Sequence, residues 1–341
     1  MKTQAAVLNK QNAPLEIWDL EIPFLQSGQV LVKIAYSGFC RTQLNEIHGL
    51  KGYDRFIPHT LGHEGSGVVE AIGPDVKKVK EGDRVVLSWI KGQGADISQC
   101  KYGIVNSGAI STFMTHAVIS ENRVVPIPHK MPLREAALLG CTLPTGGGVV
   151  KNEMQLEAGS SFAFFGAGGV GLSALLMAKD ARASLRIAID INESKLIRAS
   201  NCGATHLINA LHRDPVSAIF EITSGEGVDY VLESAGQRQA MEQAFRSLKV
   251  QGGLCVLAGN LSQGESISID PFELICGKKM IGTWGGNSNI DRDVPYYVDL
   301  YLKGRIDLSC LITHEVPLIH INELISDLES DLVGRGLVRC S

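Results

Sequence analysis

A glycine-rich turn between a strand-like and a helix-like segment constrains the fold of this chain more than any other feature. Residues 162–165 form an apolar run, a G-x-G-x-x-G pattern follows at Gly166, Gly168 and Gly171, and residues 172–179 have helical character. Glycines at this spacing allow a tight turn, close approach of the backbone to a pyrophosphate, and packing of the helix on the strand. The phosphate would lie at the helix N-terminus. The pattern predicts a nucleotide-binding strand, turn and helix.

An acidic residue at the end of the next strand-like run strengthens this prediction. Asp190 closes the run 185–190 and follows Gly171 by 19 residues. A carboxylate there accepts hydrogen bonds from both ribose hydroxyls and repels a 2′-phosphate, which favours NAD over NADP. The alternative is a tight turn without a nucleotide, which the agreement of strand, helix and Asp190 disfavours.

Composition excludes several other classes of protein. The 341 residues predict about two domains at ~150 residues each, and 32 basic against 36 acidic residues, with no basic block, disfavour a nucleic-acid partner. Residues 158–178 carry no charge, but their central glycines favour a buried strand and helix over a membrane span. The N-terminal segment lacks the apolar core of a signal peptide. These features predict a cytoplasmic protein whose eight cysteines are free thiols or metal ligands.

The order of short apolar runs predicts two domains that differ in secondary structure. Strand-like runs separated by turn signals predict a mostly β domain up to about residue 142, and alternating strands and helices predict a doubly wound parallel sheet from about 150 to 280. The first group comprises 30–36, 67–72, 84–89, 113–119 and 123–127, and the second comprises 161–165, 185–190, 228–233 and 252–258. A helix at 321–330 and a strand at 336–339 are expected to return to the first domain.

Cys40, His63 and Cys141 are candidate metal ligands. Two thiolates and one imidazole suit zinc, and three protein ligands leave a fourth position open for water or substrate. Spacing alone does not establish that these residues bind a metal, because a single Cys or His is more often packed in the core than used as a ligand. The other cysteines that we assign to buried filler are Cys202, Cys255, Cys276, Cys310 and Cys340.

Several motifs in one order resemble the zinc-dependent medium-chain alcohol dehydrogenases of the medium-chain dehydrogenase/reductase superfamily. They are G-F-C-R-T at 38–42, G-H-E-G-S-G-V-V-E-A-I-G-P-D-V at 62–76, G-D-R-V at 82–85, G-C-T-L-P-T-G at 140–146, G-A-G-G-V-G-L at 166–172 and D-I-N-E-S-K at 190–195. The resemblance covers essentially the whole chain. It implies an α/β protein with a GroES-like, mostly β catalytic domain (1–148 and 286–341) and a Rossmann NAD-binding domain (149–285).

The resemblance also assigns roles to residues of the catalytic domain. It makes Cys40, His63 and Cys141 the ligands of one catalytic zinc per subunit, and places the acidic Glu64 beside the metal. Thr42 matches the hydroxyl that takes the proton of the alcohol.

Further roles concern the cofactor and the substrate. Trp89 matches a substrate-pocket position, although a core tryptophan at a strand end is an equal alternative. The matching cofactor contacts are Arg41 and Arg335 for the pyrophosphate, Gly166, Gly168, Gly169 and Gly171 for the glycine turn, Asp190 and Lys195 for the adenosine ribose, and Val170 and Thr145 for the nicotinamide.

Three departures from the family pattern matter. Residues 90–110 hold only Cys100 where the family has four cysteines, so we predict no structural zinc. Gln43 replaces an Asp that orients the histidine ligand, which predicts a less basic imidazole. Asn45 replaces the histidine that ends the proton relay, so the relay ends in water, in His48 or in His59.

The prediction is therefore an oxidoreductase that moves a hydride between a primary or secondary alcohol and NAD. The short 90–110 lobe and the segment 106–113 resemble bacterial members that act on polyols or sugar-like alcohols. The alternatives are a zinc-free NADPH quinone or enone reductase of the same superfamily and a non-catalytic nucleotide-binding protein, both of which the intact ligand set disfavours. The family pairs subunits through the sheet edge around 280–290, so a homodimer or homotetramer is expected.

Overall fold

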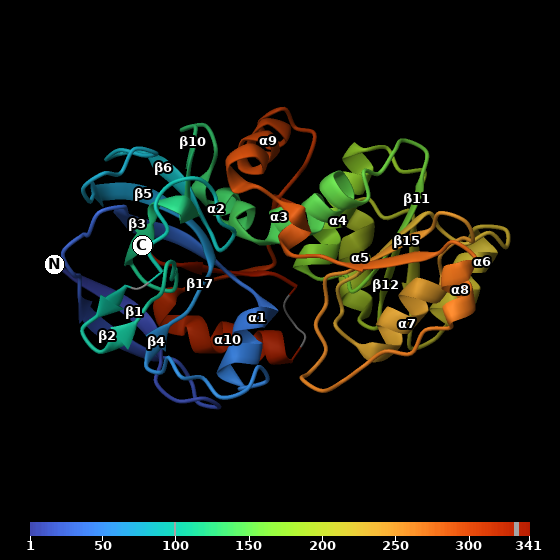
Figure 1. Cartoon of the computed structure of the whole chain (residues 1–341), viewed down its shortest axis with the longest axis horizontal. Coiled ribbons are helices and arrows are strands. Elements are labelled where there is room, and N and C mark those ends of the chain that lie inside the picture. Colours follow the sequence, from blue (N-terminus) through green and yellow to red (C-terminus); the bar gives the residue numbers. More distant parts are fainter. Residues whose placement is uncertain (99, 331–333) are drawn as a thin grey trace. The chain divides into compact units, whose positions relative to one another are not determined.

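The computed structural model describes residues 1–98, 100–330 and 334–341 (Figure 1). The chain forms two compact units. Unit 1 comprises Met1–Cys141, Asn289–Gly304 and Ile312–Ser341, and unit 2 comprises Thr142–Ser288 and Arg305–Leu311. The domain boundaries expected from the sequence, after residues 148 and 285, stay a prediction.

Unit 1 contains two β-sheets around one core. The larger sheet has the strand order β10-β6-β5-β3-β18-β17, with β9 also paired to β3, and the smaller has the order β2-β1-β4-β8-β7. The strands are β1 (Lys2–Leu8), β2 (Glu16–Glu21), β3 (Gln29–Phe39), β4 (His59–Thr60), β5 (Glu64–Ile72), β6 (Arg84–Ser88), β7 (Lys101–Tyr102), β8 (Val105–Asn106), β9 (His116–Ser120), β10 (Val124–Ile127), β17 (His314–Pro317) and β18 (Gly336–Arg339). Its helices are α1 (Arg41–Ile47), α2 (Leu133–Ala136), α9 (Ile290–Leu302) and α10 (Ile321–Glu329).

The central strand β3 explains how distant segments join unit 1. Its apolar residues Val30, Val32 and Ile34 are fully buried. It pairs antiparallel with β5, β9 and β18. The strand predicted at 336–339 is therefore present, and it brings the end of the chain back to the N-terminal unit. The strand expected at 113–119 begins only at His116, because Phe113 instead accepts a hydrogen bond from Ala6 N at 2.9 Å.

Unit 2 is a Rossmann fold, as the sequence predicted. Six parallel strands have the order β13-β12-β11-β14-β15-β16. From β11 the chain adds β12 and β13 on one side, and it then crosses back to add β14, β15 and β16 on the other side. The strands are β11 (Ser161–Phe165), β12 (Leu185–Asp190), β13 (His206–Asn209), β14 (Tyr230–Glu233), β15 (Leu254–Leu257) and β16 (Lys279–Gly282). The helices are α3 (Thr142–Gly148), α4 (Gly169–Asp180), α5 (Glu193–Cys202), α6 (Pro215–Ile222), α7 (Arg238–Arg246) and α8 (Pro271–Ile275), with a π-helical turn at Val149–Glu153.

Apolar side chains on both faces hold the parallel sheet in place. Phe165 and Ile187 pack in one cluster with Ile219 of α6 and Phe245 of α7, while Phe164 faces the glycine turn at the start of α4. Strands buried on both faces are typical of parallel sheets covered by helices. Among the residues described, no helix is long and apolar enough to cross a membrane.

Candidate active site

Cys40, His63 and Cys141 come together in unit 1, as the sequence predicted. Cys40 is the N-cap of α1, His63 directly precedes β5, and Cys141 follows the 3-10 turn Ala137–Gly140. Their ligand atoms all lie within 4.8 Å of one another. Two sulfurs and one imidazole nitrogen are a donor set that zinc prefers.

The electrostatics of this group suit a metal ligand. A hydrogen bond from Cys141 lowers the pKa of the Cys40 thiol well below its usual value, although burial acts in the opposite direction. A hydrogen bond and the charge of His63 lower it further. Because a metal binds the thiolate rather than the thiol, the residues present fit a zinc ion.

Two glycines allow the chain to bring the ligands this close. Gly62 has a φ of +93°, and a Cβ on it would lie 2.4 Å from Thr112 Oγ1. A Cβ on Gly140 would lie 2.1 Å from the carbonyl oxygen of Leu87 and 2.8 Å from Glu64 Cβ. Only glycine therefore fits directly before His63 and directly before Cys141.

Gln43 holds two of the three ligands. This fully buried side chain accepts a hydrogen bond from Cys40 N at 2.9 Å through Oε1, and its amide nitrogen contacts His63 Nδ1. The amide orientation follows from this network rather than from visible hydrogens. In this orientation the amide N–H donates to Nδ1, so a neutral His63 carries its ring proton on Nε2. Binding a metal through Nε2 therefore requires the ring proton to move to Nδ1, where the side chain of residue 43 must accept it.

Glu64 and Arg335 form a buried ion pair beside the ligands. Arg335 Nη2 contacts Glu64 Oε1, and both side chains are almost completely buried. Arg335 also hydrogen-bonds the Cys40 thiol. A buried charge without a partner is strongly unfavourable. Each of these two side chains therefore holds the other in place. The structure thus places Arg335 against the metal group.

The other predicted site residues of unit 1 lie in α1, at its C-terminal end, or directly after β6. Thr42 lies half-buried in the first turn of α1, next to the exposed Arg41. Trp89 follows β6, and its ring lies edge-on to His63 at 6.5 Å between centroids. His48 ends α1, and its Nε2 lies 2.6 Å from Glu329 Oε1.

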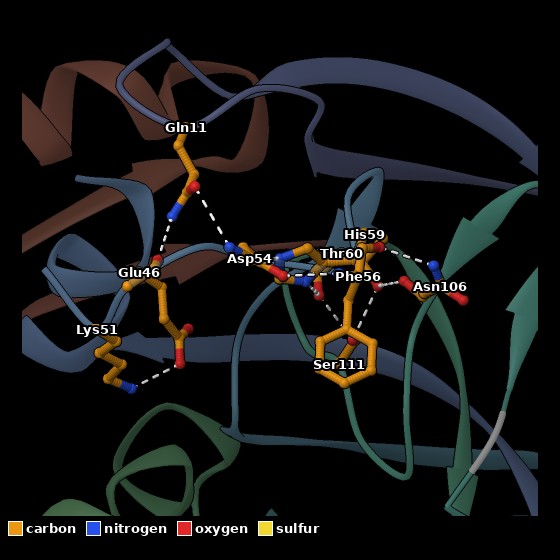
Figure 2. A network of polar contacts seen from close by, with 10 residues as sticks. Gln11, Glu46, Lys51, Asp54, Phe56, His59, Thr60, Asn106 and Ser111 are labelled. Atoms are coloured by element: carbon orange, nitrogen blue, oxygen red, sulfur yellow. Dashed lines mark hydrogen bonds and ion pairs between the residues drawn. The ribbon is translucent and has the colours of Figure 1, made fainter. Parts of the chain in front are cut away.

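A pocket of about 540 Å³ opens beside the ligand group and is lined by both Gln43 and His63. Figure 2 shows the polar network in its wall, where Glu46 binds Lys51 at 2.8 Å and Asp54 binds His59 at 2.7 Å. The network's other labelled members are Gln11, Phe56, Thr60, Asn106 and Ser111.

Sequence reasoning named His59 among these residues, and it singled out the segment 106–113, which contains Asn106 and Ser111. The available signal was the density of polar and charged side chains between residues 46 and 59. It gave no indication that Gln11 and Asn106, far away in the chain, join the same wall.

In unit 2, Asp190 supports the glycine turn. Its Oδ2 accepts a hydrogen bond from Ala167 N at 2.7 Å, and its Oδ1 accepts one from Asn192 N at 2.9 Å. Asn192 in turn caps α5 by accepting from Ser194 N and Lys195 N. The predicted ribose residues Asp190 and Lys195 therefore belong to one hydrogen-bonded segment that begins at the glycine turn.

The predicted nicotinamide residues Thr145 and Val170 lie on two helices that touch. A Cβ on Gly146 of α3 would lie only 2.1 Å from the carbonyl oxygen of Val170 in α4. The close contact between α3 and the first turn of α4 brings Thr145 and Val170 into the same part of unit 2.

Comparisons with known proteins agree with this arrangement. Residues 26–129 match the family model described as alcohol dehydrogenase GroES-like domain, and residues 169–303 match that described as zinc-binding dehydrogenase. The chain is 34% identical to alcohol dehydrogenase class-3 of Pisum sativum, over 99% of this chain and 96% of that protein.

Two solved structures are similar over the whole chain. The crystal structure of benzyl alcohol dehydrogenase from Acinetobacter calcoaceticus is 33% identical with a TM-score of 0.93, and covers 100% of both chains. An alcohol dehydrogenase zinc-binding domain protein from Burkholderia ambifaria is 32% identical with a TM-score of 0.91, and the match covers 100% of this chain and 99% of that one.

The chain therefore belongs to the zinc-binding medium-chain alcohol dehydrogenase family. It is an oxidoreductase of the zinc-dependent alcohol dehydrogenase class, with a GroES-like domain and a Rossmann domain.

Proposed function

We propose that this protein is an NAD-linked alcohol dehydrogenase in which Cys40, His63 and Cys141 hold one catalytic zinc. The convergence of these three side chains within 4.8 Å carries the proposal. A zinc ion held there supplies a Lewis acid that polarises the alcohol oxygen and lowers its pKa. A non-catalytic nucleotide-binding protein, or a zinc-free reductase, has no use for this ligand set.

The chain's own groups then orient the ligands and carry the proton. Gln43 fixes His63, and the Glu64–Arg335 pair holds Arg335 against Cys40. Thr42 accepts the proton of the alcohol at its hydroxyl oxygen. Trp89, edge-on to His63, narrows the space for the substrate.

We assign the end of the proton relay to His48. Asn45 cannot take a proton at neutral pH, whereas the imidazole of His48, bound to Glu329 and partly open to solvent, can pass one to water. A His48→Gln variant is expected to lower kcat and to leave zinc content unchanged. An unchanged kcat would remove His48 from the relay.

NAD is the expected cofactor, and when bound it supplies the acceptor of the hydride. Asp190 supports this choice because its carboxylate lies at the end of β12 next to the glycine turn. We place the adenosine ribose at Asp190 and Lys195, the nicotinamide at Thr145 and Val170, and the pyrophosphate at Gly166, Gly168, Gly169 and Gly171. Of the two arginines that the family resemblance gives to the pyrophosphate, Arg41 is exposed, whereas Arg335 is buried against Glu64 and Cys40.

The polar pocket supports a polyol or sugar-like alcohol as substrate. Its wall combines charged pairs with amide and hydroxyl groups, including the buried hydroxyl of Ser107, which has no hydrogen-bond partner among the residues described. Hydroxyl-rich substrates bind such groups better than an aromatic alcohol does, because an apolar ring leaves them unpaired. Higher kcat/KM for polyols than for benzyl alcohol is expected, and the reverse order would refute this substrate class.

Two further features bear on metal content and assembly. Burial raises the pKa of Cys100 to about 11, so this thiol is a poor ligand and supports the absence of a structural zinc. Strand β16 is at the edge of its sheet, and Phe272, Ile275 and Trp284 nearby are mostly exposed. This apolar edge supports a homodimer or homotetramer, which light scattering coupled to gel filtration would test.

The experiment for the proposed function is an NADH assay on zinc-loaded protein with NAD and an alcohol panel. Wild-type protein is expected to turn over, and a Cys40→Ser variant to lose both zinc and activity. A Cys100→Ser variant serves as the matched control and is expected to retain both. Turnover by a metal-free Cys40→Ser protein would refute the proposal.

A further inference from the structure

Two cysteines in unit 2 contact each other, although the sequence suggested that both are filler. Cys202 is the last residue of α5, and Cys310 lies in the 3-10 turn Ser309–Leu311. Their thiols hydrogen-bond to each other, and Cys202 Sγ lies 3.8 Å from the carbonyl oxygen of Cys310. Their separation of 108 positions along the chain places this contact beyond any local motif.

The surroundings make the pair accessible to small reagents. Cys202 is only 2% exposed and Cys310 is half-buried, but both line a small pocket of about 90 Å³. Leu176, Asn201 and Ile306 also line this pocket, together with the charged Lys179, Arg305 and Asp307. A molecule of nearly the size of water fits a space of this volume.

The charges around the pair favour one sulfur as the nucleophile. The hydrogen bond from Cys310 and the charge of Arg198 lower the pKa of Cys202 against the effect of burial. The hydrogen bond to Cys202 and burial raise the pKa of Cys310. Because the thiolate is the reactive form of cysteine, the charge of Arg198 makes Cys202 the more reactive partner. Cys310 Sγ donates to the carbonyl oxygen of Asp307 at 3.2 Å and stays the resolving thiol.

We propose that Cys202 and Cys310 are an oxidation site that takes hydrogen peroxide or another small hydroperoxide and closes into an intramolecular disulfide. The adjacent sulfurs, the pocket that reaches both of them and the carbonyl oxygens of Asp307 and Cys310 that hold the thiols in place carry this proposal. The site is separate from the metal group and does not depend on the proposed function.

The reaction balances with the peroxide as the only oxidant. The Cys202 thiolate attacks one peroxide oxygen, the O–O bond breaks, and the leaving hydroxide takes up the proton lost by Cys202 to give water. The resulting Cys202 sulfenic acid is attacked by Cys310, the S–S bond forms, and the S–O bond breaks. The second hydroxide takes the proton of Cys310 and leaves as water. Two thiols thus lose two electrons in total, and one hydrogen peroxide becomes two water molecules.

The disulfide would join α5 to the short segment Arg305–Leu311. This segment is the only part of unit 2 after Ser288, and the chain returns to unit 1 on both sides of it. Arg305 already binds Asp180 through two hydrogen bonds of 2.8 Å. A covalent link would add a second attachment that a thiol reductant can remove.

The test is a stepwise hydrogen peroxide titration of the zinc-loaded full chain, followed by non-reducing tryptic mapping. Each cysteine lies in its own tryptic peptide, Cys202 in 199–213 and Cys310 in 306–335. The expected product is a linked pair of these peptides that appears at low peroxide and disappears with dithiothreitol. Absence of the linked pair, at doses that oxidise the half-buried Cys276, would overturn the proposal.

Serine variants test the two roles. Cys310→Ser is expected to leave a sulfenic acid on Cys202 that dimedone traps, and Cys202→Ser to remove the trapping at this pair. Cys276→Ser, at the end of α8, is the matched control and is expected to form the linked pair as the wild type does. Equal dimedone labelling of Cys202 and Cys310 in the two variants would contradict the assignment of the nucleophile.

Thermal melting gives a readout that does not rely on chemical labelling. Oxidised wild-type protein is expected to melt several degrees higher than reduced protein, because a cross-link across about 100 residues strongly restricts the unfolded chain. Neither serine variant at the pair is expected to show this rise. The same rise in Cys202→Ser would show that oxidation elsewhere causes it.

Discussion

Replacing Asp190 by alanine tests how the chain selects its cofactor. The carboxylate accepts hydrogen bonds from Ala167 N and Asn192 N at 2.7 and 2.9 Å, and in the proposed complex it also accepts from the ribose. Each hydrogen bond to a charged group contributes about 1.5–3 kcal/mol. Loss of two ribose bonds therefore raises the barrier by about 3–6 kcal/mol, which corresponds to a fall in kcat/KM for NAD of roughly 10²–10⁴-fold.

NADP is expected to respond differently to the same change. The variant removes the charge that repels a 2′-phosphate, so kcat/KM for NADP is expected to stay level or to rise. Steady-state kinetics with both cofactors measure the ratio directly, and urea unfolding measures the cost of the two lost backbone contacts, about 3–6 kcal/mol on the same scale.

Asp214→Ala provides the matched control for this experiment. Asp214 caps α6 in the same unit by accepting from Ser217 N at 2.9 Å, and loss of such a cap costs about 1 kcal/mol. This variant is expected to lose stability without any change in cofactor preference. The reasoning fails if Asp190→Ala keeps the NAD:NADP ratio of the wild type, or if Asp214→Ala changes it equally.

Three further predictions follow from the structure. Gly140→Ala is expected to cost about 1–3 kcal/mol in urea unfolding and to weaken zinc binding, because its Cβ would lie 2.1 Å from the Leu87 carbonyl oxygen; unchanged zinc affinity would contradict this. Gln43→Glu is expected to strengthen zinc binding about tenfold in a chelator competition, because a carboxylate accepts from an Nδ1–H of His63, whereas the Gln43 amide nitrogen that faces Nδ1 only donates; weaker binding would contradict this. Burial raises the pKa of Glu233 from 4.5 to about 7, so the folded chain holds this proton more tightly than the unfolded chain does. The resulting stabilisation is complete below about pH 4.5 and is lost as the pH rises through 7. A Glu233→Gln variant, compared with wild type by melting across this range, is expected to lack this component, and identical pH profiles would refute it.

The nucleotide-binding part of unit 2 could be predicted from the sequence because its determinants are local. The strand, the glycine turn and helix α4 occupy one continuous segment, and Asp190 follows in the next strand. Each short piece has its own pattern of apolar residues and glycines. The edge strands β13 and β16 were not predicted because at most one of their residues is buried, so neither has an apolar run like those of the central strands β14 and β15.

The metal group required more than local pattern. Cys40, His63 and Cys141 are far apart in the chain, and only the family motifs around them separated these residues from the other cysteines. The structure adds what the motifs do not contain, such as the contact of Gln43 with His63 and the position of Arg335 between Glu64 and Cys40.

The pocket wall and the thiol pair could not be predicted because neither has a local signature. Gln11 reaches the segment that contains Asp54 through hydrogen bonds to Gly52 O and from Asp54 N. Cys202 meets Cys310 only because residues 305–311 belong to unit 2. Such contacts depend on the folded arrangement of whole elements, which spacing along the chain does not reveal.

Zinc titration of the metal-free protein tests the central claim most directly. NADH formation from NAD and a polyol is followed as zinc is added, with bound zinc measured in the same samples. Activity is expected to rise in proportion to bound zinc and to saturate at one zinc per chain, and Cys40→Ser is expected to bind no zinc at this site. Full activity without metal, or saturation only at two zinc ions per chain, would contradict the account.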